Sequence, residues 1–176
     1  MQIISTSLDG VLEIRVSPHR DERGFFARTY DEALFAKAGM PTRWPQCSTS
    51  WNRRRGTLRG MHYQIEPYLE PKLIRCTKGR ILDVAVDLRP DSPAFCQWAA
   101  LELSAESRNG MFIPGGFAHG FLTLEDDCEV SYQMAENYVA ELSRGARWND
   151  PAFGIVWPEP PALLSERDAN YPDFTG

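Results

Sequence analysis

The sequence lacks the features that would mark a membrane, secreted or nucleic-acid-binding protein. No stretch approaches the roughly 18 consecutive apolar residues that a bilayer-spanning helix needs. The first residues, MQIISTSLDG, have neither the basic region nor the apolar core of a signal peptide, so the sequence predicts a cytoplasmic protein. Nineteen Lys and Arg face 24 Asp and Glu, a formal charge of −5, which leaves no diffuse basic field for nucleic acid or an anionic membrane. Any phosphate that the protein binds must meet a local cluster of cations.

Metal-binding and redox motifs are missing too. The four cysteines lie far apart and form no Cys-x-x-Cys pair, which argues against zinc and thioredoxin-like sites and favours reduced thiols. Among the three histidines there is no His-x-His, the pattern that barrel-type metalloenzymes often present before a carboxylate. The sequence therefore predicts neither a metal nor another cofactor.

What the sequence has instead is a series of short strand-like segments. Its 176 residues, 43% of them hydrophobic, suit one globular domain spanning residues 1–176. Thirteen Gly and 13 Pro favour many turns. Apolar side chains recur with a period of two, most clearly in residues 80–88 and more briefly near 11–16, 57–64, 72–77, 97–104, 110–114, 119–124 and 128–135. This pattern predicts an all-β antiparallel sandwich or barrel of the jelly-roll type.

Helical signal is brief. Residues 31–39 place Leu34, Phe35 and Ala38 on one face of a helix that stops at Gly39. The Pro-rich tail predicts an extended wrap that ends in a short turn or helical piece, so the domain has one or two short helices.

Three polar residues interrupt apolar strand faces. Lys72 shares strand parity with Ile74, so its ammonium is either a cation directed into the core or a strand-end lysine reaching back to water. Asp83 is alone on its face and needs a donor, for which a histidine on a neighbouring strand would serve. Tyr132 is either a core aromatic or an acid.

Two histidines occur in glycine-flanked strands. His62 lies in TLRGMHYQ and His119 in IPGGFAHGF. Gly60 inside a strand predicts a bulge or a close backbone approach, either of which could aim Arg59 and His62 into one cavity despite their opposite parity. Each histidine taken alone is equally open to a structural role.

Eight strings together identify a resemblance to a known family. They are DERGFF, QCSTSW, GTLRGMHYQ, PKLIRCTKG, ILDVAVDLRPDSP, FIPGGFAHGF, WNDPAFGIVWP and LLSERD. In order and spacing, from residue 3 to residue 172, they resemble the dTDP-4-dehydrorhamnose 3,5-epimerase family. The resemblance implies a cupin-type jelly roll that works without metal, as a homodimer, on a nucleoside-diphosphate-linked 4-keto-6-deoxyhexose.

The resemblance also implies roles for particular residues. By it, His62 is the general base, Asp168 orients that imidazole, Tyr132 donates a proton from the opposite side, and Lys72 faces the C4 oxygen. It places at the substrate Arg23, Phe26, Gln46, Arg59, His119 and Arg167, with Asp83 supporting His119. In the family, the segment with Arg23 and Phe26 reaches across the dimer, so that two chains complete each site.

The chemistry requires these residue types independently of the family. A proton on the carbon beside a ketone is a very weak acid, so an imidazole can remove it only if a fixed cation or donor stabilises the enolate. Inversion then needs a second group, an acid, on the other face of the sugar, because one base cannot serve both faces.

Three departures from the family pattern concern substrate recognition. The chain has Arg28 where the family usually has glutamate, Ser48 in place of asparagine, and Ser143 in place of glutamate. Because a glutamate can accept the N3 proton of thymine and an arginine cannot, the base need not be thymine. Three alternatives therefore stay open: a sister single-carbon epimerase or ketoisomerase acting on another nucleotide sugar, for example a CDP-linked one; a non-catalytic sugar-nucleotide-binding cupin; and, last, a metal-dependent cupin.

Overall fold

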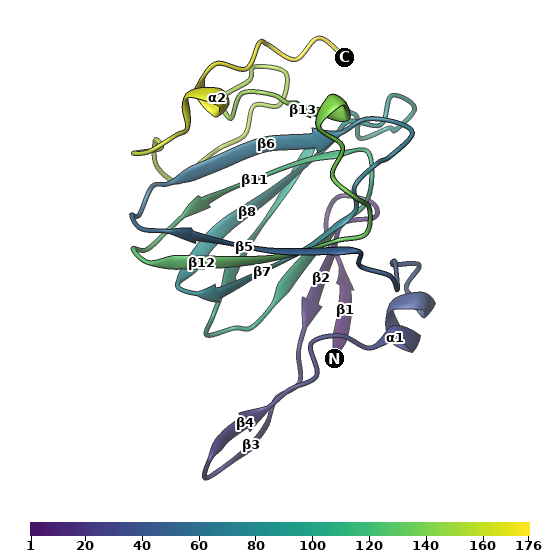
Figure 1. Ribbon diagram of the computed structural model, residues 1–176, viewed down its shortest axis with the longest axis vertical. Helices are drawn as coiled ribbons and strands as arrows, with labels where there is room; N and C mark the ends of the chain where they lie inside the picture. The colour runs from purple at the N-terminus through teal and green to yellow at the C-terminus, as the bar shows by residue number, and fades with distance from the viewer.

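The computed structural model describes residues 1–176 and is built almost entirely from antiparallel strands (Figure 1). A six-stranded sheet has the order β1-β2-β10-β7-β12-β5, and a five-stranded sheet has the order β13-β6-β11-β8-β9. The first sheet consists of β1 (Gln2–Ser5), β2 (Leu12–Arg15), β10 (Gly110–Ile113), β7 (Lys72–Lys78), β12 (Cys128–Met134) and β5 (Gln46–Asn52). The second consists of β13 (Ser143–Gly145), β6 (Leu58–Gln64), β11 (Phe117–Thr123), β8 (Arg80–Asp87) and β9 (Trp98–Ser104). The predicted all-β sandwich is confirmed.

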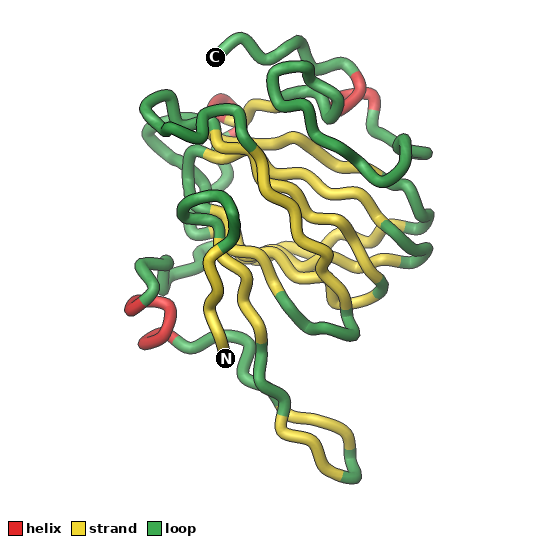
Figure 2. The backbone as a smooth tube through the Cα atoms, turned by 180° about the vertical axis from the view of Figure 1, so that it is seen from behind, coloured by secondary structure: helices red, strands yellow, loops and turns green.

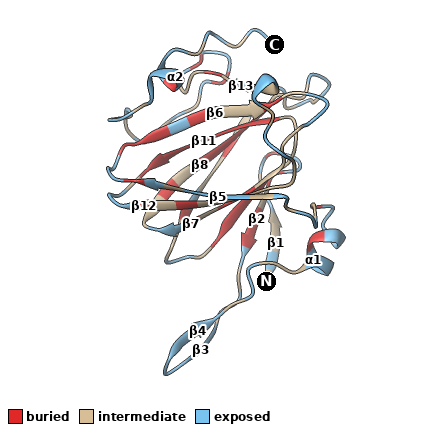
Figure 3. Ribbon diagram, in the orientation of Figure 1, coloured by how far each residue is buried: buried red, intermediate tan, exposed pale blue.

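The main core lies between the two sheets. Ile74 and Val130 reach it from the six-stranded sheet, and Ile81, Leu103 and Phe121 reach it from the five-stranded sheet. Strand β8 is buried on both faces (Figure 3), which explains its nearly continuous apolar run. Each face of this strand therefore serves a different cluster, one between the sheets and one on the outside of the five-stranded sheet.

The outer face of the five-stranded sheet is covered by the C-terminal segment. Phe153 is buried there against Val84 and Val86, and Trp157 and Phe174 pack around them. The segment includes the short helix α2 (Glu166–Ala169). The expectation of an extended wrap with a short helical piece is confirmed, and the wrap brings the end of the chain over strand β6 (Figure 1).

Helix α1 (Glu32–Lys37) covers part of the outer face of the six-stranded sheet. Asp31 caps its first turn by accepting a hydrogen bond from the backbone N–H of Leu34. Of the three residues expected on its buried face, only Phe35 is buried, whereas Leu34 and Ala38 are exposed. A six-residue helix has too few turns to bury a full stripe, so one aromatic side chain anchors it. A 3-10 turn, η1 (Ala140–Leu142), precedes β13. No helix of the protein is long and apolar enough to cross a membrane.

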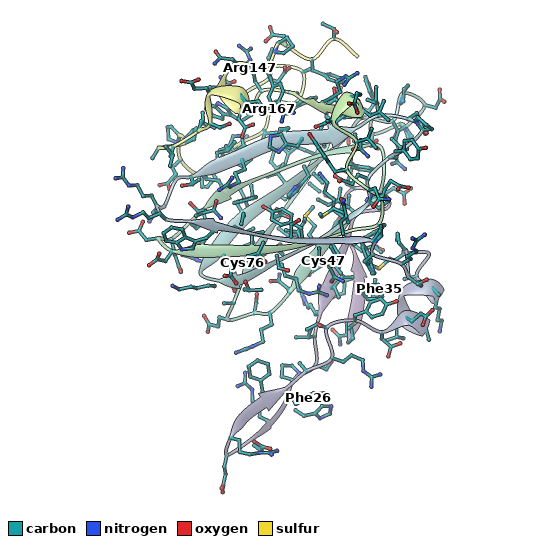
Figure 4. All side chains as sticks on the ribbon, viewed as in Figure 1. Phe26, Phe35, Cys47, Cys76, Arg147 and Arg167 are labelled. Atoms are coloured by element: carbon teal, nitrogen blue, oxygen red, sulfur yellow. The ribbon has the colours of Figure 1, made fainter.

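A hairpin formed by β3 (His19–Asp21) and β4 (Gly24–Phe26) projects from the body of the molecule, as the two opposite views show (Figures 1 and 2). All of its strand residues are exposed. Phe26, labelled in Figure 4, is 74% exposed although it is a large apolar side chain. The hairpin therefore has no partner within its own chain that would bury this ring.

Candidate active site

Strands β7 and β12 place Lys72 and Tyr132 on the inner face of the six-stranded sheet. Their register sets Lys72 opposite Met134 and Tyr132 opposite Ile74, and Ile74 belongs to the core between the sheets. Side chains on paired residues share a face. Only 12% of the Lys72 side chain is exposed. The interpretation of Lys72 as a strand-end lysine that reaches water is therefore wrong, and its ammonium points inward.

On the opposing sheet, strand β6 brings Arg59 and His62 to the inner face together. His62 pairs with His119 and Arg59 pairs with Phe121, with a shift of register between the two pairs. Gly60 lies at this shift with a φ of +136°, and a Cβ there would lie 2.5 Å from the Cα of Gly120. The predicted irregularity and the close backbone approach are both confirmed, and only glycine fits this position.

His62 is held by a carboxylate from the C-terminal tail. Its Nε2 lies 2.7 Å from Oδ1 of Asp168, and the backbone N–H of Gly60 donates to Oδ2 at 3.3 Å. Asp168 is 6% exposed and His62 38% exposed, so the imidazole faces open space while its partner is enclosed. Burial raises the pKa of Asp168, but the hydrogen bond and the charge of His62 outweigh burial, and the net pKa is below its usual range. Asp168 is thus anionic at neutral pH.

A second histidine–carboxylate pair lies beside the first. Nε2 of His119 is 2.7 Å from Oδ1 of Asp83, and both side chains are buried. The prediction that a histidine on a neighbouring strand satisfies Asp83 is confirmed. Burial raises the pKa of Asp83, and the nearby charges of His119 and Lys72 oppose that rise. Oδ2 of Asp83 has no hydrogen-bond partner.

Lys72 has a carboxylate partner that the sequence analysis did not identify. Its Nζ lies 2.9 Å from Oε2 of Glu70, and only 11% of the Glu70 side chain is exposed. The available signal was the spacing of two, because residues 70 and 72 of an extended segment point to the same side. The ion pair keeps the ammonium within the space between the sheets.

Tyr132 is linked to Arg59 across the sandwich by a chain of hydrogen bonds. Nε of Arg59 donates to Oδ1 of Asn52 at 2.7 Å, Nδ2 of Asn52 donates to Oγ of Ser50 at 3.3 Å, and Ser50 lies 3.1 Å from the Tyr132 hydroxyl. Burial raises the pKa of Tyr132 to about 12. The phenol therefore carries its proton throughout the physiological pH range.

Two cavities contain these side chains. One, of about 650 Å³, is lined by Pro45, Gln46, Cys47, Ser48, Glu70, Lys72, Tyr132, Met134 and Tyr138. The other, of about 390 Å³, is lined by residues that include Arg59, His62, Arg167 and Asp168. The hydrogen bonds from Arg59 to Tyr132 join residues of the two cavities, and the ring centroids of His119 and Tyr132 lie 6.3 Å apart. His62 and Tyr132 thus lie on the inner faces of opposite sheets.

The remaining predicted substrate contacts divide into three groups, two of which lie at the cavities. Gln46 and Ser48 line the larger cavity, where Gln46 also accepts the backbone N–H of Tyr138 at 2.9 Å. Arg167 of α2, labelled in Figure 4, lines the smaller cavity and donates to the hydroxyl of Ser143 at 3.3 Å. Tyr138 was not anticipated, because a single exposed tyrosine in a loop gives no periodic signal.

Arg23, Phe26 and Arg28 line neither cavity. Arg23 pairs with Asp21 on the projecting hairpin, and Arg28 pairs with Asp31 at the start of α1, both at 2.6 Å. Within a single chain, these three residues therefore lie apart from the residues that line the two cavities. No group of three or more His, Cys, Asp or Glu side chains is arranged to hold a metal ion.

Comparison with known proteins gives a consistent result. The sequence model described as dTDP-4-dehydrorhamnose 3,5-epimerase matches residues 5–176. A protein of that name from Methanothermobacter thermautotrophicus is 44% identical over 173 residues, covering 97% of this chain and 92% of the relative.

Solved structures agree with the sequence comparison. The Bacillus anthracis dTDP-4-dehydrorhamnose 3,5-epimerase with TDP and PPi bound superposes with a TM-score of 0.94 at 36% identity, covering 98% of this chain and 99% of the other. The Legionella pneumophila dTDP-6-deoxy-D-glucose-3,5-epimerase, in complex with dTDP-4-keto-L-rhamnose, gives a TM-score of 0.91 at 35% identity, covering 97% and 90%. From its motifs, its fold and these matches, the chain belongs to the dTDP-4-dehydrorhamnose 3,5-epimerase family.

Proposed function

We propose that this chain, acting as one domain, is a metal-independent epimerase that inverts C3 and C5 of a nucleoside-diphosphate-linked 4-keto-6-deoxyhexose. The simplest substrate is dTDP-4-dehydro-6-deoxy-D-glucose, and the product is then dTDP-4-dehydro-L-rhamnose. The observation that carries the proposal is the placement of a histidine–carboxylate pair and a protonated tyrosine on the facing sides of one sandwich. A binding protein needs no base and acid on opposite faces.

Proton abstraction is assigned to His62. Asp168 contacts one ring nitrogen, which leaves the other to take the proton from the carbon beside the ketone. An anionic Asp168 also stabilises the imidazolium that forms. The partial exposure of His62 leaves its free edge accessible to a sugar.

Lys72 stabilises the enolate, and Tyr132 donates its own proton to the carbon; the tyrosinate left behind then takes a proton from water. The ammonium is fixed by Glu70 and faces the space between the sheets, where charge on the C4 oxygen is costly unless a cation meets it. Tyr132 retains its proton up to a pKa of about 12, so it acts as a donor rather than as a base at neutral pH. Donation from the sheet opposite His62 gives inversion instead of return to the same face.

Deuterium incorporation tests this function. We expect the sugar to gain deuterium at both C3 and C5 when the protein is incubated in heavy water with dTDP-4-dehydro-6-deoxy-D-glucose. Mass spectrometry and proton NMR measure this incorporation. Incorporation at one carbon alone would indicate a single-carbon epimerase. Binding without any incorporation would refute catalysis and support the non-catalytic cupin.

The nucleotide carrier is a separate part of the proposal. Arg59 and Arg167 supply guanidinium groups at the smaller cavity for the diphosphate, since planar forks suit phosphate oxygens. Arg28, Ser48 and Ser143 replace the acceptors that the family uses, so the base is the least constrained part of the substrate. Isothermal titration with dTDP, CDP, UDP and GDP measures the preference. Tightest binding of dTDP would remove the reason to consider another base.

We further propose that two chains form a homodimer in which the β3–β4 hairpin of each reaches the partner's cavity. The support is the exposed Phe26, the projection of the hairpin away from the sheets (Figure 2), and the absence of hairpin residues from the lining of either cavity. Subunit complementation tests this: Arg23→Ala and His62→Ala chains are each expected to be inactive, and co-expression restores about a quarter of wild-type activity because only mixed dimers contain one intact site. If Arg23 served its own subunit, no activity would return.

A further inference from the structure

Tyr171 lies against the catalytic histidine, and no role has yet been assigned to it. It follows Asp168 by three residues in the C-terminal tail. The centroid of its ring is 6.1 Å from that of His62, and the two planes meet at 70°. This is the edge-to-face arrangement that aromatic rings prefer.

The ring occupies the place of a missing side chain in the sheet. Gly145 on β13 is paired with His62 on β6, so a side chain at position 145 would stand next to the imidazole. A Cβ on Gly145 would lie 2.6 Å from Cε1 of Tyr171 and closer still to Cζ and Cε2. The tyrosine ring therefore rests directly on the Gly145 backbone, where any other residue would displace it.

His62 has a neighbour on several sides as a result. Within its sheet it has His119 on one side and Gly145, covered by Tyr171, on the other, because β6 lies between β11 and β13. Asp168 contacts one ring nitrogen. Only the edge that faces the cavity is left open.

The hydroxyl of Tyr171 does not explain its position. This oxygen is buried and forms no hydrogen bond of regular geometry, although the nearby Arg167 guanidinium opposes the rise that burial causes in the pKa of Tyr171. The guanidinium of Arg167 lies 5.7 Å from the centroid of the Tyr171 ring, so the ring also contacts an arginine of the smaller cavity. The contacts of Tyr171 with Gly145 and His62 are therefore made by its ring.

We propose that Tyr171 is a positioning residue for His62, and that Gly145 is glycine to admit its ring. The ring fixes the plane of the imidazole so that one nitrogen stays on Asp168 and the other faces the substrate carbon. The catalytic part of this inference rests on the proposed epimerase function.

Three single variants test the proposal. Tyr171→Phe keeps the ring and is expected to retain wild-type kcat. Tyr171→Ala removes the ring, and Gly145→Ala displaces it by its Cβ; each is expected to lower kcat for deuterium exchange about ten- to a hundredfold, with little change in KM, because a misplaced base slows proton transfer more than binding. The double variant is expected to be no worse than the poorer single variant, because both act through one ring.

A spectroscopic measurement separates positioning from general stability. The 15N signals of the His62 ring, assigned with His62→Ala as reference, are expected to change in Tyr171→Ala and Gly145→Ala and to stay as in the wild type in Tyr171→Phe. Wild-type kcat in Tyr171→Ala, or independent and multiplying losses in the double variant, would overturn the proposal. If Tyr171→Ala fails to fold, Gly145→Ala and Tyr171→Phe decide the question in the same way. If the wild type shows no deuterium exchange, the proposed function fails, whereas the ring signals still test the positioning.

Discussion

The buried ion pair between Lys72 and Glu70 allows catalysis and stability to be separated by mutation. Both side chains are nearly nine-tenths buried, at 12% and 11% exposed, and their charged atoms are 2.9 Å apart. Replacing Lys72 by Met leaves the Glu70 carboxylate without its cation in an enclosed place. Breaking a buried pair by removing one partner costs about 3–5 kcal/mol.

The expected thermal shift follows from the size of the chain. For a protein of this length, 1 kcal/mol moves the midpoint of unfolding by about 2–4 °C, so Lys72→Met should lower Tm by roughly 6–20 °C. Replacing Glu70 by Met as well removes the uncompensated charge, and we expect the double variant to recover most of the lost Tm, since apolar replacement of a whole buried pair is often neutral. Differential scanning calorimetry measures both shifts.

We expect the double variant to recover Tm but not kcat. Loss of the cation that we propose to stabilise the enolate oxygen is expected to lower kcat by about 10²–10³-fold in the single and the double variant alike. Lys78→Met is a matched control, because Lys78 is 64% exposed and its nearest carboxylate oxygen is 4.0 Å away. Wild-type Tm in Lys72→Met, or restored activity in the double variant, would refute the reasoning.

Four further variants test the rest of the site. His62→Ala is expected to abolish deuterium exchange at both carbons, whereas Tyr132→Phe retains some exchange and loses net inversion; full activity in either variant, measured by NMR, would contradict the assigned roles. Gly60→Ala is expected to lower both Tm and kcat, because its Cβ would lie 2.5 Å from the Gly120 backbone at a φ of +136°; a Tm equal to that of the wild type would show that the bulge can relax. The pKa of Asp168 is lowered in the folded protein, so its contribution to stability is full above the ordinary value of about 3.9 and is lost as pH falls through the lower folded value. The Tm difference between wild type and Asp168→Asn, followed by calorimetry, should therefore be largest near neutral pH and narrow in acid; a constant difference would contradict this linkage.

Strands with a regular apolar alternation could be predicted from the sequence, and strand β5 could not. Its residues, QCSTSWN, are mostly polar and largely exposed. The inner positions of β5 are Gln46, Ser48 and Ser50, which face a cavity or the Tyr132 hydroxyl instead of the apolar core. The missing hydrophobic pattern is therefore a consequence of the site itself.

Some contacts between distant segments could also be predicted from the sequence, and others could not. The pairing of Asp83 with His119 was predictable, because a buried carboxylate requires a donor and few were available. The proximity of Tyr171 to His62 was not, since it depends on how an irregular tail folds back over strand β6. Glu70 was missed because an acidic residue before a strand is usually solvated.

The tail that supplies Asp168 also determines when the protein can become active. Every strand ends by Gly145, yet the carboxylate that holds His62 is 106 positions further along the chain than the histidine. During translation, all strands are therefore synthesised before Asp168, the carboxylate that contacts the His62 imidazole. Proteolysis before Asp168 would remove the anion of the imidazole together with Phe174, which packs on the outer face of the five-stranded sheet.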